Sequence, residues 1–136
     1  MSDEHSFQRF FKEELEKWNG HCPSLVASMF MAGMPDLIIN TSKGYTYYTE
    51  LKFWRNKNPP SNSQQIQALL RGPQIAVIKH TLWKRSIACP IIAQLQYDMD
   101  TCAVAYKDKF LLANVKTMAK IMALLSSKEQ FDTLFT

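Results

Sequence analysis

Two carboxylates and one ammonium group stand at a spacing that suits metal-assisted chemistry. Asp36 begins one apolar segment, and Glu50 and Lys52 lie toward the end of a second apolar segment that follows a tight turn. Hard cations such as Mg²⁺ prefer oxygen ligands and are usually held by one or two carboxylates together with substrate phosphate. A lysine beside such a pair could hold a phosphate or an attacking water. The pattern therefore points to metal-assisted cleavage of a phosphodiester.

The composition is that of one folded domain with a mild positive charge. The chain has 136 residues, of which 46% are hydrophobic, so residues 1–136 can bury a single core. Lys and Arg total 16 against 12 acidic residues, and the formal net charge is +4. A charge of this size permits an acidic partner without requiring one.

The cysteines and the start of the chain exclude several classes of protein. Cys22, Cys89 and Cys102 form no Cys-x-x-Cys pair, which argues against a disulfide framework or a zinc knuckle. The chain starts with polar and acidic residues, so we expect no signal peptide. No apolar run approaches the ~20 residues of a membrane span. We therefore expect a cytoplasmic protein with reduced thiols and no membrane partner.

Elements that would position the charged residues are predicted as two strands, 36–40 and 45–53. Partner numbers in an antiparallel pair sum to a constant, and a loop of 42–44 or of 41–45 gives a sum of 86. This register places Asp36 directly opposite Glu50, with Cβ atoms about 5 Å apart. A loop of 41–44 gives a sum of 85 and puts the two carboxylates on opposite faces. We favour the sum of 86, and Glu50 and Lys52 share a face in either register.

The remaining periodicity predicts helices and strands around this hairpin. Helices are expected over 4–18, over 64–70 after a cap at Ser61 or Ser63, over 110–125, and after a capping box at 126–129. Strands are expected over 24–31, 74–79, 91–97 and 101–106, with a basic loop at 81–85. This order predicts a mixed α/β domain in which a central sheet is flanked by helices.

The segment Gly33–Asp36, followed by Glu50-Leu51-Lys52 and by a glutamine on the next helix, resembles the core of the PD-(D/E)xK nucleases. The VRR-NUC branch and the archaeal Holliday-junction resolvases are the nearest types. The match runs from about residue 4 to 80, and residues 81–136 bring additional strands and C-terminal helices. The resemblance implies a restriction-endonuclease-like core and an endodeoxyribonuclease that depends on Mg²⁺ or Mn²⁺.

The resemblance also implies roles for residues of the predicted hairpin. Asp36 and Glu50 would be the principal metal ligands, and the backbone carbonyl of Leu51 would complete the direct ligation by protein. Lys52 would orient or help to deprotonate the attacking water and would stabilise charge on the phosphate.

Two further roles fall on helices, and each has a rival. Gln65 would brace the site or a substrate phosphate, and we prefer it to Gln64, which points away from the apolar face. A water-mediated metal contact from the first helix would come from Glu4, which matches the family's spacing, with Glu14 as the alternative. Taken alone, Glu4 reads as an acid that interacts with the helix dipole, and Gln65 as an ordinary surface residue.

Two features bear on binding partners: basic side chains that could contact DNA, and the predicted helix 110–125 that could form a dimer. The candidate DNA-binding residues are Arg55, Lys57, Lys79, Lys84 and Arg85, and Trp83 beside the last two could stack a base. A solvated loop accounts equally well for the group around Trp83. The apolar stripe on 110–125 is either core or the seam of a homodimer, since junction-cutting relatives act as two-fold dimers.

The leading hypothesis is therefore a metal-dependent endonuclease that selects branched DNA such as a Holliday junction. A phage origin is suggested by the resemblance alone. A non-catalytic nucleic-acid-binding or host-inhibitor module on the same fold is the rival, although such a module gains nothing from two carboxylates that face phosphates. A sequence-specific restriction-like nuclease ranks last, because the small chain leaves little room for a separate recognition domain.

Overall fold

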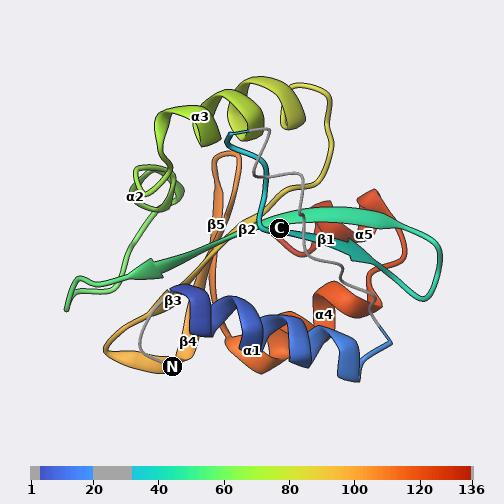
Figure 1. Ribbon diagram of the computed structural model, residues 1–136, viewed down its shortest axis with the longest axis horizontal. Helices are drawn as coiled ribbons and strands as arrows, with labels where there is room; N and C mark the ends of the chain where they lie inside the picture. Colours follow the sequence, from blue (N-terminus) through green and yellow to red (C-terminus); the bar gives the residue numbers. More distant parts are fainter. Residues whose placement is uncertain (1–3, 20–31, 136) are drawn as a thin grey trace.

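A mixed five-stranded sheet forms the centre of the computed structural model, which describes residues 4–19 and 32–135 (Figure 1). The sheet order equals the chain order, from β1 to β5. β2 and β3 pair in parallel, and the other three neighbouring pairs of these strands are antiparallel. The strands are β1 Leu37–Asn40, β2 Thr46–Trp54, β3 Ile91–Leu95, β4 Asp98–Tyr106 and β5 Lys109–Asn114.

Helices cover both faces of this sheet (Figure 1). α1 (Glu4–Lys17) and α4 (Val115–Leu124) pack against each other and against the strands on one face. A parallel strand pair needs a crossover connection, and here the connection from β2 to β3 carries α2, α3 and η2 on the other face. The predicted mixed α/β class with a flanked central sheet is confirmed. The elements of the crossover are α2 Ser63–Gln67, α3 Gly72–Gln74 and η2 Ile75–Leu82.

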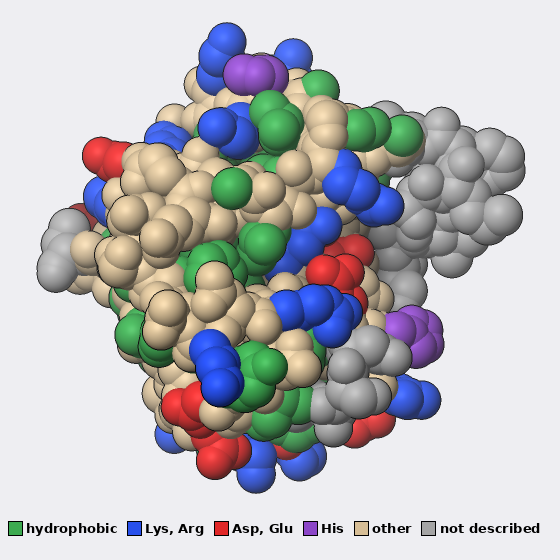
Figure 2. Space-filling view, turned by 90° about the vertical axis from the view of Figure 1, so that its left-hand side faces the viewer, with side chains coloured by type: hydrophobic (Ala, Val, Ile, Leu, Met, Phe, Trp, Pro, Cys, Tyr) green, Lys and Arg blue, Asp and Glu red, His purple; other side chains and the backbone are tan. Residues whose placement is uncertain are grey.

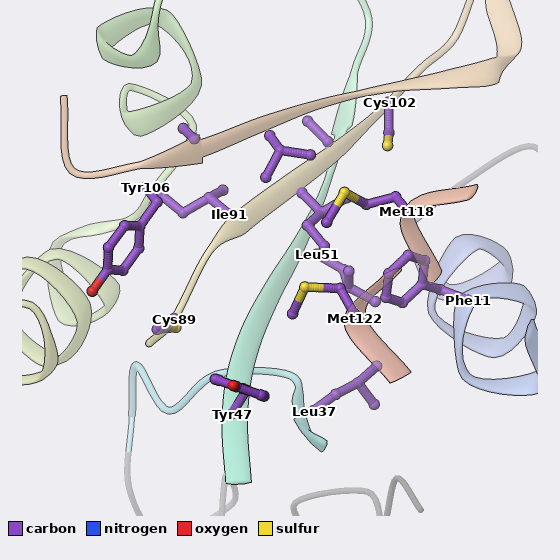
Figure 3. Packing of buried hydrophobic residues seen from close by; sticks show 14 of the residues in the cluster. Phe11, Leu37, Tyr47, Leu51, Cys89, Ile91, Cys102, Tyr106, Met118 and Met122 are labelled. Carbon is purple, nitrogen blue, oxygen red and sulfur yellow. The ribbon is translucent and has the colours of Figure 1, made fainter. Parts of the chain in front are cut away.

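The core under β2 determines which way its side chains point. Phe11 of α1 lies with Met118 and Met122 of α4 around Leu51 of β2, and all four side chains are buried (Figure 3). Full burial of each such side chain contributes roughly 1.5–3 kcal/mol. Because strand side chains alternate between faces, the core that holds Leu51 turns its two neighbours, Glu50 and Lys52, toward the opposite face. The predicted helix over 4–18 is confirmed as α1.

The hairpin adopts the favoured register. Leu37 pairs with Thr49, so the partner numbers sum to 86 and the loop is 41–45. The loop is closed by a hydrogen bond of 2.8 Å that the Thr41 N–H donates to the carbonyl oxygen of Tyr45. Asp36 directly precedes β1, and this register sets it against Glu50.

The strand that the sequence predicts over 74–79 is wrong, because these residues belong to α3 and to the π-helical η2. Pro73 lies in the first turn of α3, where its missing N–H costs no helical hydrogen bond. Ile78 is fully buried, whereas its neighbours Val77 and Lys79 are half-buried. A short apolar run rich in β-branched residues does not by its periodicity distinguish a strand from a helix that packs on a sheet.

Predictions for the C-terminal part are confirmed in part. The hairpin of β3 and β4 forms as expected, although β4 already begins at Asp98. The helix predicted over 110–125 is wrong in its first part, because β5 runs to Asn114 and Leu111 lies in that strand. The Asn114 side chain accepts hydrogen bonds of 3.0 and 3.3 Å from two backbone N–H groups and so caps α4. The predicted last helix is confirmed as α5 (Lys128–Thr133), but its N-cap is Ser127, one residue after the start of the predicted capping box 126–129.

Two smaller expectations also need correction or fall outside the structure. The predicted helix over 64–70 is the shorter α2, and its N-cap is Asn62 instead of Ser61 or Ser63. The predicted strand 24–31 lies outside the described residues. No helix among residues 4–19 and 32–135 is long and apolar enough to cross a membrane.

Gly33 lies where the segment before β1 meets α3. Its φ is +88°, and an added Cβ would lie 2.1 Å from the carbonyl oxygen of Pro73. Gly44 in the hairpin loop has a similar φ of +86° but open space around the position of an added Cβ. Substitution of either glycine therefore strains the backbone, because φ is positive at both. Only at Gly33 would the new Cβ also collide with another segment.

We expect Gly33→Ala to destabilise the fold more than Gly44→Ala does. Gly44→Ala should cost about 1–2 kcal/mol of unfolding free energy from the positive φ alone. Gly33→Ala adds a backbone collision and should cost at least about 2 kcal/mol more. Urea unfolding of the two variants measures this difference, and equal losses would contradict a close contact between Gly33 and α3.

Candidate active site

β2 carries Glu50 and Lys52 on one face, both almost fully buried. Glu50 is 1% exposed and Lys52 is 6% exposed. The Lys52 Nζ lies 3.5 Å from Oε2 of Glu50. Burial of charged groups in the middle of a sheet is costly unless the charges are paired or bind an ion. Burial of Glu50 and Lys52 therefore costs free energy of folding, and the fold alone does not explain why they are buried.

Asp36 reaches the same place from the end of β1. Its Oδ2 accepts a hydrogen bond of 2.8 Å from the backbone N–H of Leu51. The N–H and C=O groups of one strand residue point to the same edge, so the Leu51 carbonyl also faces the side of β1. The β1–β2 ladder ends at the Leu37–Thr49 pair, and the Leu51 carbonyl lies beyond it. The structure thus brings together Asp36, Glu50, Lys52 and the backbone of Leu51, as predicted.

Burial raises the pKa of both carboxyl groups. Burial, followed by the negative charge of Asp36, raises the pKa of Glu50 to about 8, and the charge of Lys52 opposes this. Burial also raises the pKa of Asp36, although the Leu51 N–H and the Lys52 charge act against the shift. Two acids that share a desolvated site in this way cannot both ionise readily. A cation bound between them would relieve the repulsion.

One oxygen of Glu50 supports a metal site in particular. Oε1 is buried and has no hydrogen-bond partner, which is uncommon for a buried carboxylate oxygen. Asp36, Glu50 and a backbone carbonyl form an all-oxygen donor set, which fits Mg²⁺ or Mn²⁺. In the part of the chain that the structure describes, no three His, Cys, Asp or Glu side chains lie together so that they could hold a metal ion. Backbone, water or substrate oxygens would therefore complete the coordination.

Gln74 of α3 is the site residue that the sequence interpretation missed. It is 4% exposed, and its Nε2 donates a hydrogen bond of 2.8 Å to Oε2 of Glu50. Its Oε1 accepts one of 2.9 Å from the backbone N–H of Arg71, which fixes the amide orientation. The sequence interpretation placed Gln74 in a strand over 74–79, and for this reason did not consider it for the site. The segment Arg71-Gly72-Pro73-Gln74 does carry a signal, since Gly-Pro followed by Gln matches the start of a capped helix.

Gln65, the glutamine assigned to the site, serves a different purpose. Its Oε1 accepts a hydrogen bond of 2.7 Å from the Ser61 N–H, so its side chain closes the first turn of α2. Gln65 and its rival Gln64 are both exposed. The structure therefore brings neither of them to the carboxylates, and Gln74 takes the position expected for the glutamine.

Of the two α1 glutamates that the sequence offers for the site, Glu4 and Glu14, Glu4 is the one near it. Glu4 lines an open hollow together with Lys52 and Leu69, and its charge adds to the burial that raises the pKa of Asp36. Glu14 instead forms an ion pair of 2.8 Å with Lys17. The preference for Glu4 over Glu14 thus agrees with the geometry.

Basic side chains lie around the carboxylates in two groups. Arg55 lines the same hollow as Lys52, with its guanidinium 5.0 Å from the centre of the Phe53 ring, and Lys57 follows in an adjoining hollow. Arg71, which the sequence interpretation did not select, lines a third hollow beside Asp36 and Gln74. On the face that Figure 2 shows, Lys and Arg side chains lie next to acidic ones.

The basic residues after α3 lie on a separate element. Lys79 is half-buried on η2, and Lys84 and Arg85 are exposed just after it. Of the two alternatives for the group around Trp83, base stacking by this residue is wrong, because its ring is buried and packs edge-on against Tyr106. Its Nε1 donates a hydrogen bond of 2.9 Å to the carbonyl oxygen of Cys89. Trp83 is thus a core residue.

Comparison with known proteins adds a likeness of fold. No protein-family model matches the chain, and no curated protein sequence does. Among solved structures, the chain is similar to Hjc, a Holliday junction resolvase from the archaeal hyperthermophile Archaeoglobus fulgidus. The TM-score is 0.46 and the sequence identity 14%, over 82% of this chain and 75% of that chain.

Proposed function

We propose that this protein is a metal-dependent endodeoxyribonuclease of the PD-(D/E)xK type that acts on branched DNA. The observation that carries the proposal is the buried cluster of Asp36, Glu50 and Lys52, in which Gln74 holds one oxygen of Glu50 and the other has no protein partner. A module that only binds nucleic acid gains nothing from carboxylates buried at this cost.

Asp36, Glu50 and the Leu51 carbonyl would hold Mg²⁺ or Mn²⁺. When bound, such an ion lowers the pKa of a coordinated water and offsets charge on the phosphate in the transition state. The Leu51 N–H and the Gln74 amide each fix one carboxylate oxygen, so the donor set is oriented before substrate binds.

Lys52 would place its ammonium group beside the scissile phosphate, where it stabilises developing negative charge and orients the attacking water. The Lys52 Nζ already lies 3.5 Å from Oε2 of Glu50, so the ammonium group needs no large movement to act beside the carboxylates. Glu4 would contribute through water from the start of α1.

Substrate contacts would come from the surrounding cations. Arg71 on one side of the carboxylates and Arg55 and Lys57 on the other suit the phosphates of a strand that crosses the site. Lys79, Lys84 and Arg85 would contact a more distant arm. The preference for branched DNA and a homodimeric state rest on the resemblance of the motif to junction resolvases, because a two-fold dimer presents one site to each of two strands.

The proposal is tested by cleavage of a panel of labelled DNAs with Mg²⁺, Mn²⁺ or EDTA. The panel holds a four-way junction, a flap, a splayed duplex, a plain duplex and a single strand. We expect cutting of branched DNA that needs the metal and is lost in Asp36→Ala. In the same assay Gln74→Ala should reduce cutting at least about tenfold, whereas Gln65→Ala should leave it within about twofold.

The rival function makes the opposite prediction. A non-catalytic DNA-binding or inhibitor module would bind the panel in EDTA and cut none of it with any divalent ion. That outcome would overturn the proposed nuclease and favour the rival.

A further inference from the structure

A hollow beside the candidate active site is walled by aromatic and apolar side chains. Trp54 at the end of β2 and Tyr97 in the turn between β3 and β4 line it, together with Pro59 and Leu95. Tyr97 is 61% exposed, which makes it the most exposed of the large hydrophobic side chains among the described residues. An aromatic ring that stays in water beside a second ring is costly for the fold and useful for a planar ligand.

This hollow is continuous with the site. Trp54 and Asn56 line both it and the hollow that contains Lys52 and Arg55. Trp54 lies two residues after Lys52 on the same face of β2, about 6.6 Å along the strand. A DNA strand with its scissile phosphate at Lys52 therefore passes Trp54 within the reach of about one nucleotide.

The Trp54 ring is held in place before any ligand arrives. Its Nε1 donates a hydrogen bond of 2.8 Å to the carbonyl oxygen of Asn58. The Asn58 N–H in turn donates one of 3.0 Å to the side chain of Asn56, which stiffens the loop after β2. A fixed ring loses little conformational freedom on binding, so contact with a ligand is more favourable.

The charges around the hollow favour a base within it and a phosphate at its rim. Lys57 supplies a cation at the edge, suited to the backbone of the same strand. The Asp98 carboxylate also lines the hollow and disfavours a phosphate inside it. Carboxylate oxygens accept hydrogen bonds from the exocyclic amino groups of bases, and aromatic rings stack on any base.

We propose that this hollow binds one unpaired nucleobase of the strand that crosses the active site. The proposal rests on the proposed function and narrows its substrate to DNA with an unpaired nucleotide next to the cleaved phosphate. A base paired in a duplex is stacked on its neighbours and cannot enter a pocket walled by two rings, so the hollow selects branch points and single-stranded arms.

The test is a binding series in Ca²⁺ and in EDTA with a splayed duplex whose arm carries one abasic residue at successive positions. We expect one position at which loss of the base weakens binding about tenfold. Tyr97→Ala should weaken binding of the intact arm by a similar factor and leave binding of the arm with that abasic residue unchanged. Tyr45→Ala, an exposed tyrosine of the hairpin loop, is the matched control and should change neither.

Two outcomes would overturn the inference. One is an affinity that is the same for every abasic position. The other is a loss with Tyr97→Ala that is equal for intact and abasic arms, because the tyrosine would then contact something other than the base. Trp54→Phe, which keeps a ring but removes the hydrogen bond to Asn58, should give a smaller loss at the same position.

DNA binding and DNA cleavage are measured in separate assays, so failure of the base site can be distinguished from failure of the proposed nuclease. Cleavage of branched DNA without a position-dependent abasic effect would leave the nuclease intact and remove the base site. A position-dependent abasic effect that depends on Tyr97, in protein that cuts no DNA, would retain the base site and remove the nuclease.

Discussion

Lys52→Met is expected to lower DNA cleavage by roughly 10²–10⁴-fold, as the removal of a group that stabilises transition-state charge or moves a proton does. The substitution keeps most of the side-chain volume and removes a cation that is 3.5 Å from Glu50. It should not abolish divalent-cation binding, because the oxygen donors remain and the removed charge repels a bound ion. Cleavage would then be lost while the metal-dependent rise in melting temperature persists.

A second effect of the same substitution has to be separated from the first. Lys52 lowers the pKa of Glu50 and of Asp36, so Lys52→Met raises both and makes protons compete harder with the metal. Cleavage is therefore measured at pH 9 with saturating Mn²⁺, where this competition is weakest. If activity returns to near the wild-type level there, Lys52 acts only through the carboxylates and the proposed contact with phosphate is wrong.

Arg55→Met is the matched control for this experiment. Arg55 is a neighbouring cation, but it is exposed and lies over the Phe53 ring. Its removal should raise the DNA concentration needed for half-maximal cleavage and change the rate at saturating DNA little, because the proposed function gives it a contact with the DNA backbone and no part in holding the metal.

The site could be predicted from the sequence wherever local pattern determines position. Counting residues around a short turn reduces the register of β1 and β2 to two choices, and the favoured one, which sets Asp36 against Glu50, is the one that forms. The alternation of strand side chains placed Glu50 and Lys52 on one face. Neither inference needs the rest of the molecule.

Gln74 could not be predicted in this way, because its position depends on a contact between distant segments. Gly33 packs against the backbone of Pro73, and this close approach lays α3 beside the segment that leads to Asp36. A glycine that is needed for one long-range contact looks locally like an ordinary turn residue. Gln65, in contrast, lies on the first helix after Lys52 in the sequence. The local pattern does not reveal that its side chain accepts a hydrogen bond from the Ser61 N–H.

The strand and helix errors have a related cause. Leu111 falls on the apolar stripe of a helix that includes Val115, and the sequence alone supports that helix well. The structure extends the sheet through Asn114 instead, because β5 pairs with β4 from Lys109 to Asn114. The hydrogen bonds of this pairing cannot be read from the local sequence pattern. The strand predicted over 74–79 is wrong for the converse reason, since these residues pack onto the sheet as helix.

Glu50→Gln should remove most of the loss of stability that the metal-free protein shows as the pH rises. The folded-state pKa of Glu50 is about 8, above its ordinary value of 4.5, mainly because the carboxyl is buried. The folded state thus keeps the proton that the unfolded chain releases. The associated stability is fully present below about pH 4.5 and is lost as the pH rises through about 8. For a shift of this size the loss is on the order of 5 kcal/mol.

Glutamine removes the titration and can still accept the hydrogen bond from Gln74, so the variant should keep most of its stability at pH 8.5 in EDTA. The remaining slope would come from Asp36, whose pKa is also raised. Addition of Mg²⁺ or Mn²⁺ at pH 8.5 should stabilise the wild type, because the ion binds the folded carboxylates, and should affect Glu50→Gln little.

Urea unfolding between pH 5 and 8.5, with EDTA or with Mn²⁺, measures both effects. Asp100→Asn, which removes an exposed carboxylate of β4, is the control and should follow the wild-type profile. A metal-free wild type as stable at pH 8.5 as at pH 5 would show that Glu50 is not held protonated in the fold. Equal stabilisation of the wild type and Glu50→Gln by Mn²⁺ would place the metal elsewhere. The buried carboxylate would then lack the role that explains its cost.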